Sequence, residues 1–148
     1  MTHKTRAGCL TVAVLATSMA AGGPVIAGQR STDENKKPSV ALKATPPLGF
    51  APLKVRAVVD LKGGANDYAD FYCANVEWDW ADGTTSGSSE DCEPYEAGKS
   101  EIKRRFSVEH VFRRADNYRV AFRLKRRDKA VGFATVQVQV RPGLPEGL

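Results

Sequence analysis

The chain has 148 residues, with 22 basic and 17 acidic side chains and a formal net charge of +5. Removal of a predicted leader of 27 residues leaves 121, which is the size of one domain and is enough to bury a core without several disulfides. The length therefore excludes both a chain of several domains and a small fold held together mainly by disulfides. The charge is unevenly placed, because residues 60–96 carry a net charge of −9 and residues 99–129 a net charge of +8.

The first segment, residues 1–27, has the features of a secretory signal peptide. It contains two basic residues, no acidic residue and an apolar stretch over 10–21. As a helix that stretch is too short to span the roughly 30 Å hydrocarbon core of a bilayer. Residues 25–27 form a predicted cleavage site, and 18–20 form an alternative one. We therefore expect a secreted or periplasmic protein with no transmembrane segment in the mature chain.

The mature chain is predicted to begin with a disordered leader, residues 28–38, because this stretch is polar, charged and without periodicity. Residues 39–141 form the predicted domain, with the alternation of apolar and polar residues that is typical of β-strands. The alternation is clearest in 40–44, 53–59, 71–80, 102–112, 118–124 and 134–140. We expect about seven short antiparallel strands in two packed sheets, a polar loop over 84–98, and a short tail over 142–148.

The cysteines add a constraint on the loops. Cys9 leaves with the leader, so Cys73 and Cys92 remain as a pair in an exported protein, where a disulfide is the expected state. Cys73 is out of phase with Trp78 and Trp80 on the same run, which predicts a disulfide that clamps the outer loop and does not join the sheets through the core. The alternative is a free pair used in redox or metal chemistry, which no CxxC spacing supports.

Three motifs follow one another in the order found in polycystic kidney disease (PKD) domains. The run Trp78-Asp79-Trp80-Ala81-Asp82-Gly83 resembles the Trp-Asp-Phe-Gly-Asp-Gly signature of these domains. Further on, His110-Val111-Phe112 resembles their His-x-Tyr motif, and residues 117–124 resemble their Gly-x-Tyr-x-Val-x-Leu strand. The resemblance covers about residues 39–141. The chain departs from the family pattern at Trp80, Ala81, Phe112 and Asn117, where PKD domains have Phe, Gly, Tyr and Gly.

This resemblance implies an immunoglobulin-like β-sandwich in an exported protein, and it implies neither catalysis nor a cofactor. Such domains serve as spacers or as modules that contact protein or carbohydrate. The motif residues expected to support the fold are Trp78, Asp79, Trp80, Asp82, Gly83, His110, Phe112 and Tyr118. We therefore predict a non-catalytic exported module for protein or carbohydrate contact or for a structural role, with an unknown protein or polysaccharide as its partner.

The aromatic and histidine side chains of these motifs are expected to be structural. Trp78 shares its phase with Val76 and is predicted to lie in the core. Trp80 lies at a strand end, where the alternatives are a core position and a half-exposed ring that stacks on a sugar. We expect a buried or half-buried His110 that bonds to backbone, because no serine or cysteine has a recognisable partner motif for nucleophilic catalysis. No enzyme is predicted.

A calcium site is an alternative use of the acidic segment. The candidate ligands are Asp79, Asp82, Glu90, Asp91 and Glu93. Together with loop carbonyls they would supply the six to eight oxygens that calcium prefers, although their spacing does not match an EF-hand loop. The structural alternative for Asp79 and Asp82 is hydrogen bonding to the backbone N–H groups of a tight turn.

The basic segment suggests a second function, the binding of an anionic glycan or a membrane surface. The side chains predicted to form one positive stripe are Lys103, Arg104, Arg105, Arg119, Arg123 and Arg126. The alternative is a solvated face that the acidic segment partly neutralises. The predicted export and the lack of interleaved exposed aromatic residues argue against nucleic acid as the partner.

Overall fold

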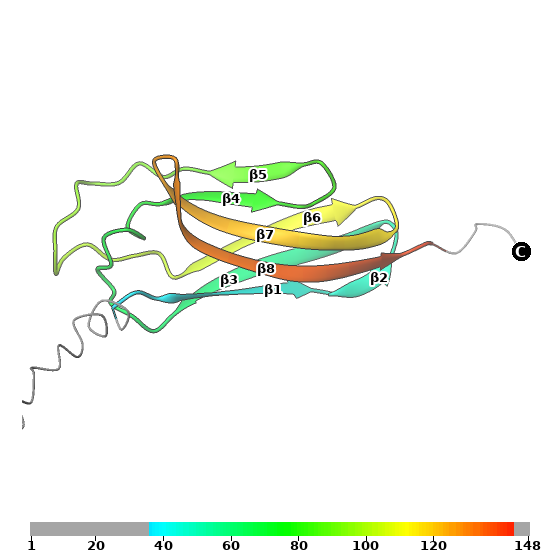
Figure 1. The fold of residues 1–148 in the computed structure, drawn as a ribbon, viewed down its shortest axis with the longest axis horizontal. Helices are drawn as coiled ribbons and strands as arrows, with labels where there is room; N and C mark the ends of the chain where they lie inside the picture. Colours follow the sequence, from blue (N-terminus) through cyan, green and yellow to red (C-terminus); the bar gives the residue numbers. More distant parts are fainter. Residues whose placement is uncertain (1–35, 144–148) are drawn as a thin grey trace, which may run out of the picture.

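The computed structural model describes residues 36–143 and shows an all-β protein with an immunoglobulin-like sandwich fold (Figure 1). Its eight strands form two sheets, in place of the predicted seven or so. No helix within residues 36–143 is long and apolar enough to cross a membrane. The predicted signal peptide, the predicted cleavage site and most of the predicted disordered leader lie outside the described residues.

The smaller sheet has three antiparallel strands in the order β1-β3-β6. They are β1 (Ser39–Thr45), β3 (Leu53–Lys62) and β6 (Arg105–Phe112). On β3, the side chains of Val55, Ala57 and Val59 are fully buried while Lys54 and Arg56 are exposed, which is the two-residue alternation expected from the sequence.

The larger sheet has five strands in the order β2-β8-β7-β4-β5. They are β2 (Leu48–Phe50), β8 (Lys129–Arg141), β7 (Asp116–Arg126), β4 (Asn75–Asp79) and β5 (Thr85–Ser88). Its strands are antiparallel except for β2, which pairs in parallel with the end of β8. The chain crosses from the edge of one sheet to the edge of the other at Pro46 and Pro47, where proline can supply no N–H group to a ladder.

Strand boundaries differ from the predicted ones at three places. The predicted third strand, 71–80, begins only at Asn75, because Phe71 and Tyr72 donate backbone hydrogen bonds to the Tyr68 carbonyl and Cys73 has a left-handed φ of 52°. The predicted polar loop 84–98 contains β5, whose residues Thr85–Ser88 have no apolar alternation. The three residues of β2 are too few to form a pattern.

Aromatic side chains fill the space between the sheets. Trp78 and Trp80 stack in parallel with their ring centres 6.0 Å apart, and Phe122 meets Trp78 edge-on at 4.7 Å. Trp78 lies in the core as predicted, with 4% of its surface exposed. The Trp80 side chain is fully buried, so the alternative of a half-exposed, sugar-stacking ring is wrong. Its ring is covered because β6 from the opposite sheet passes over it.

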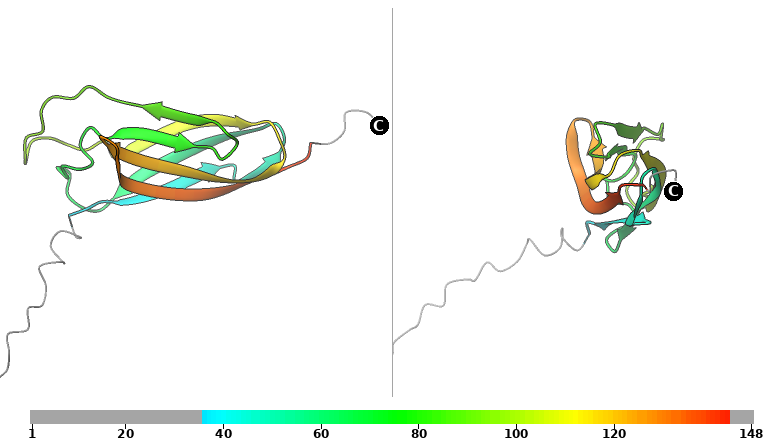
Figure 2. Two further views of the ribbon diagram at one scale, coloured as in Figure 1. Left: turned by 45° about the horizontal axis from the view of Figure 1, so that its top comes forward. Right: turned by 90° about the vertical axis from the view of Figure 1, so that its right-hand side faces the viewer.

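The two ends of the sandwich are built differently (Figure 2). One end, here called the loop end, carries the long connections over residues 63–74 and 89–104. The other, the turn end, carries the short β4–β5 and β6–β7 turns and the last residues of β8. The predicted disulfide between Cys73 and Cys92 is present at the loop end, with 6.1 Å between the two Cα atoms. It ties the segment before β4 to the β5–β6 loop.

Candidate functional site

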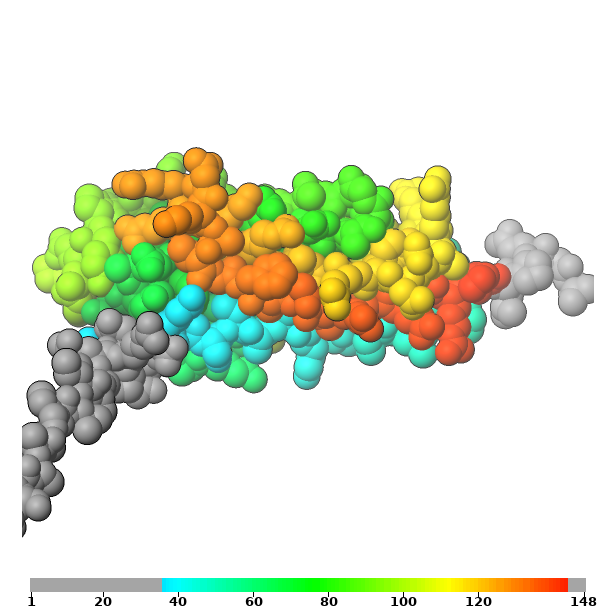
Figure 3. All heavy atoms as spheres, in the orientation of Figure 1, coloured from blue at the N-terminus to red at the C-terminus, as the bar shows by residue number. Residues whose placement is uncertain are grey.

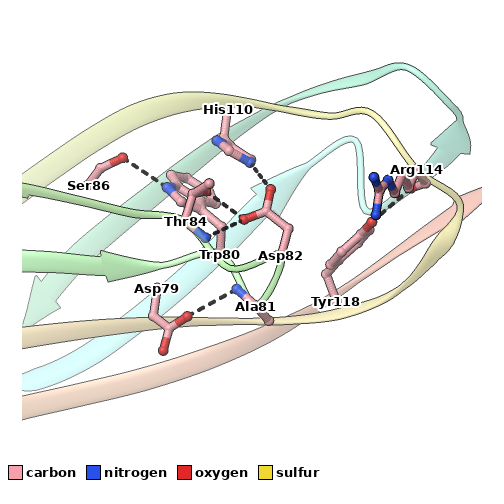
Figure 4. Close-up of polar contacts among 9 residues, drawn as sticks. All are labelled: Asp79, Trp80, Ala81, Asp82, Thr84, Ser86, His110, Arg114 and Tyr118. Carbon is pink, nitrogen blue, oxygen red and sulfur yellow. Dashed lines mark hydrogen bonds and ion pairs between the residues drawn. The ribbon is translucent and has the colours of Figure 1, made fainter.

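The motif residues after β4 form a tight turn held by two aspartates (Figure 4). The Ala81 N–H donates to Asp79 Oδ1 at 3.1 Å. Asp82 Oδ1 accepts two hydrogen bonds, from the Thr84 N–H at 2.9 Å and from the Thr84 hydroxyl at 2.6 Å. Two residues are left-handed, Gly83 with φ 89° and Ala81 with φ 60°. Left-handed backbone favours glycine, so Ala81 holds a conformation that alanine disfavours.

A histidine from the opposite sheet closes onto this turn. His110 on β6 lies with Nε2 2.7 Å from Asp82 Oδ2, and its ring stacks in parallel on Trp80 with 4.3 Å between the ring centres. Trp80 in turn donates from Nε1 to the Ser86 hydroxyl at 2.9 Å. We call Trp80, Asp82, Thr84, Ser86 and His110 the motif cluster. Because β4 and β6 belong to different sheets, the motif cluster connects the two sheets at the turn end (Figure 4).

Electrostatics within the motif cluster favours the ionised form of Asp82. Partial burial alone would raise the pKa of this carboxyl group. The hydrogen bonds from the Thr84 hydroxyl, from His110 and from the Thr84 N–H outweigh burial, so the pKa of Asp82 lies below its ordinary value of 3.8. An ionised Asp82 accepts all three hydrogen bonds at neutral pH.

A hollow of about 580 Å³ opens beside the motif cluster, between the β4–β5 and β6–β7 turns. Tyr118 lies along it and donates from its hydroxyl to the Arg114 carbonyl at 2.9 Å. Burial, and then the carboxylates of Asp116 and Asp82, raise the pKa of Tyr118. This arrangement does not activate a nucleophile. The Thr84 hydroxyl donates to the aspartate, whereas a hydroxyl that a histidine activates as a nucleophile donates to the imidazole.

The structure does not bring the five candidate calcium ligands together. Asp79 and Asp82 lie at the turn end, whereas Glu90, Asp91 and Glu93 belong to the β5–β6 loop at the loop end. Glu90 forms an ion pair with Lys103. Within residues 36–143 no three histidine, cysteine or acidic side chains form a group that could hold a metal ion. The aspartates instead accept the backbone hydrogen bonds of a tight turn.

The six basic residues predicted to form one stripe lie on separate faces of the molecule. Arg105 projects from the three-stranded sheet, where it pairs with Asp60 at 3.6 Å, while Arg119 and Arg123 project from the five-stranded sheet. Their strands, β6 and β7, follow each other in sequence but belong to opposite sheets, so the outward side chains point in opposite directions. This separation of the two strands is what the linear pattern could not show.

Most of these six side chains are also engaged within the described part of the chain. Arg104 donates to the carbonyls of Leu61, Gly63 and Gly64 and to the Asn66 side chain. At the loop end, Lys103 pairs with Glu90, and Arg126 pairs with Asp70 and donates to the Ala69 carbonyl. Among the six, only Arg119 has no side-chain hydrogen bond or ion pair within residues 36–143. The predicted basic stripe is therefore largely neutralised.

The outer face of the five-stranded sheet carries a closed charge network on β4 and β7. Glu77 binds Arg123 at 3.1 Å and Lys125 at 2.5 Å, and Arg123 also lies over the Phe133 ring, 5.8 Å from its centre. The hydrogen bond from Lys125 is the largest cause that lowers the pKa of Glu77. These charges satisfy one another.

Three exposed large apolar side chains project from the same outer face, Leu48 and Phe50 beside the end of β8 and Phe133 near its start. Phe50 and Phe133 are 57% and 56% exposed, and Leu48 is 45% exposed. All three project outward: Phe50 and Leu48 pair in register with the exposed residues Arg141 and Gln139, and Phe133 pairs with Arg123, which belongs to the outer charge network. The fourth large exposed apolar residue of the described chain, Val111, lies on the other sheet. Sequence reasoning missed Leu48 and Phe50 because β2 was not recognised, and Phe133 because it precedes the segment assigned to the last strand.

The chain was compared with protein families, curated sequences and solved structures. No protein-family model and no curated protein sequence matches the chain. Among solved structures, the chain is similar to the PKD domain of an M14-like peptidase from a Thermoplasmatales archaeon, with 13% identity and a TM-score of 0.46. The match covers 74% of this chain and 99% of the other. The fold class rests on the two sheets described above, and membership of the PKD family stays a prediction.

Proposed function

We propose that this chain is a non-catalytic exported module that contacts a protein or a polysaccharide through the outer face of its five-stranded sheet. The observation that carries the proposal is that three of the four large exposed apolar side chains of residues 36–143, Leu48, Phe50 and Phe133, project from that face. Exposed apolar side chains that lie together, as Leu48 and Phe50 do beside the end of β8, favour a contact surface. Phe133 lies on the same face near the start of β8.

The absence of catalysis in this proposal is supported by the motif cluster. Its histidine is stacked on Trp80 and bonded to Asp82, and its hydroxyl groups, on Thr84 and Ser86, bond to Asp82 and Trp80. Each of the five residues of the cluster thus has a side-chain hydrogen bond within it. Such a cluster stabilises the sandwich and leaves no imidazole-bound nucleophile for substrate chemistry.

Export is supported by the leader pattern of residues 1–27 and by the Cys73–Cys92 disulfide, since disulfides persist mainly in oxidising compartments. The test is N-terminal sequencing of the protein recovered from the periplasm or the medium of cells that express the full chain. We expect a mature start close to residue 28. An intact N-terminus on protein found only inside the cell would contradict export.

The contact face is tested by retention of the purified mature protein on immobilised polysaccharides and on envelope fractions from the native cells. The variant Phe50→Ser/Phe133→Ser should lose most of the retention. The matched control Val111→Ser, which removes an exposed apolar side chain from the other sheet, should retain the wild-type level. Equal losses in both variants, or retention that neither variant changes, would overturn this assignment of the contact face.

A further inference from the structure

On the same outer face, near the end of β8 and the start of β7, lies a group of polar side chains that form no hydrogen bond or ion pair within residues 36–143. In register across β7 and β8, Asn117 pairs with Gln139 and Arg119 with Gln137, and Phe50 on β2 pairs with Arg141. Residues paired in register project to the same side of a sheet, so these six side chains share one surface. We call Phe50, Asn117, Arg119, Gln137, Gln139 and Arg141 the open patch.

The open patch differs in its bonding from the rest of the sheet. All six residues are exposed. Within residues 36–143 none of their side chains takes part in a hydrogen bond or an ion pair, whereas Arg123 and Lys125 on the same strand β7 are both paired with Glu77. Figure 3 looks onto this face and shows the atoms of β7, in gold to orange, and of β8, in orange to red, spread over it toward the turn end.

The open patch is positively charged, and neither of its arginines forms an ion pair within residues 36–143. It contains two arginines and no carboxylate, and the nearby Asp116 carboxylate accepts the backbone N–H of Asn117 at 2.7 Å. Guanidinium groups bind carboxylates and sulfates through two parallel hydrogen bonds, which makes arginine well suited to anions of that shape. An anionic partner is the one that complements this surface.

The remaining side chains of the open patch indicate which other chemical groups the partner carries. Gln137, Gln139 and Asn117 offer amide donors and acceptors together, which suits hydroxyl groups. Phe50 offers an apolar ring at the edge of the same surface, 57% exposed. The row Gln137-Gln139-Arg141 extends along β8 for roughly 13 Å at about 3.3 Å per residue, which is longer than a single sugar unit. Hydroxyls, anionic groups and apolar ring faces occur together in acidic polysaccharides.

We propose that the open patch binds an anionic polysaccharide, one that bears carboxylates or sulfates, with Arg119 and Arg141 on its charged groups and the amides on its hydroxyls. This rests on the proposed function, because it names the ligand class and the place on the same contact face. It replaces the predicted basic stripe with a different set of residues, of which only Arg119 is shared.

The test measures the binding of the mature protein to polygalacturonate and heparin at low salt, with dextran as the neutral control and phosphatidylglycerol vesicles as an alternative anionic surface. We expect binding to at least one of the two acidic glycans, no binding to dextran or vesicles, and weaker binding as salt rises. The variant Arg119→Gln/Arg141→Gln should weaken the affinity at least tenfold.

The matched control is Lys43→Gln/Lys62→Gln, which removes the same charge from exposed positions on the outer face of the other sheet. It should change the affinity less than twofold. A second variant, Gln137→Ala/Gln139→Ala, should weaken binding about threefold or more while leaving the salt dependence unchanged, because it removes no charge. Thermal unfolding of each variant verifies that it is folded.

Three outcomes would overturn the inference: no binding of either acidic glycan, equal losses in the arginine and lysine variants, or binding of vesicles in place of glycans. These outcomes are separable from failure of the proposed function. If acidic glycans do not bind but Phe50→Ser/Phe133→Ser still abolishes retention on envelope fractions, the contact face stands and the ligand is of another class.

Discussion

The motif cluster and the open patch lie toward the same end of the sandwich but use their polar side chains in opposite ways. In the motif cluster, Asp82 alone accepts three hydrogen bonds, and His110 is bonded to it and stacked on Trp80. The open patch has arginine, glutamine and asparagine side chains with no such bonds. Satisfied polar groups hold the two sheets together, whereas unsatisfied exposed ones are available to a partner. The difference separates residues that determine stability from residues that determine contact.

The largest expected effect follows from replacing an aromatic ring in each region. Trp80→Ala should lower the free energy of unfolding by about 3–5 kcal/mol, because it leaves a cavity between the sheets. Phe50→Ala, at a residue that is 57% exposed, should change it by less than about 0.5 kcal/mol. Urea unfolding followed by tryptophan fluorescence and circular dichroism measures both. Similar losses in the free energy of unfolding for the two variants would contradict the difference between the motif cluster and the open patch.

The disulfide at the loop end provides a third region that should act on stability without acting on contact. Cys73→Ser/Cys92→Ser opens a cross-link between residues 19 apart in sequence. The loop-entropy relation gives a loss of about 3 kcal/mol in the free energy of unfolding. Because the open patch lies at the other end, glycan affinity should not change in the folded variant. Unchanged stability, or a lost affinity, would contradict the separation of the two ends.

At acidic pH, the free energy of unfolding should depend on the ionisation of Asp82. Its pKa is lower in the folded protein than in the unfolded chain, so its contribution is present above the unfolded value, near 3.8, and is lost as pH falls through the folded value. At pH 7, Asp82→Asn should cost about 1–3 kcal/mol, because charge-assisted hydrogen bonds are weakened. The cost should shrink as pH falls below 3.8, where Asp82 becomes protonated in the unfolded chain and then in the folded protein.

This prediction is measured as the difference in urea midpoint between wild type and Asp82→Asn from pH 2 to pH 7. Taking the difference removes the titration of carboxylates that both proteins share, such as Glu77 and Glu109. The matched control is Asp116→Asn, at the nearby β7 start, whose carboxylate accepts only the Asn117 N–H in the described chain. A cost of Asp82→Asn that grows as pH falls below 3.8 would show that the sign is wrong.

The fold was predictable from sequence where a strand buries one face, because alternation then records burial directly. This holds for β3 and β7, whose inward residues Val55, Val59, Val120 and Leu124 are fully buried. It fails for β2 and β5, which are short edge strands and are placed by their pairing with β8 and β4. A short edge strand can be held by backbone hydrogen bonds to the neighbouring strand, so its sequence does not have to alternate between apolar and polar residues.

The candidate site was predictable only in part, for a related reason. Motif spacing located Asp82 and His110, but their mutual contact depends on two strands from different sheets. Basic residues close in sequence suggested one stripe, yet β6 and β7 face opposite ways. The open patch draws Phe50 from β2, which the pattern did not reveal, and its defining property, the lack of partners, requires knowledge of every neighbouring side chain. Whether a polar side chain has a hydrogen-bond partner is decided by the tertiary structure and cannot be read from the sequence pattern.

The smallest effect concerns the backbone of the motif turn. Ala81 has a φ of 60°, which costs roughly 1 kcal/mol for a residue with a Cβ atom. Ala81→Gly relieves this cost but adds entropy to the unfolded chain, so the net gain in the free energy of unfolding should be no more than a few tenths of a kcal/mol. The converse variant Gly83→Ala meets no atom within 4 Å, so its loss, expected to be about 1 kcal/mol, is due to the left-handed φ of 89° alone. Thermal and urea unfolding give both values.

A gain from Ala81→Gly that persists in the Asp82→Asn background would show that the turn holds its shape without the motif cluster. A gain that disappears there would show that the hydrogen bonds to Asp82 are what keep Ala81 in the left-handed region.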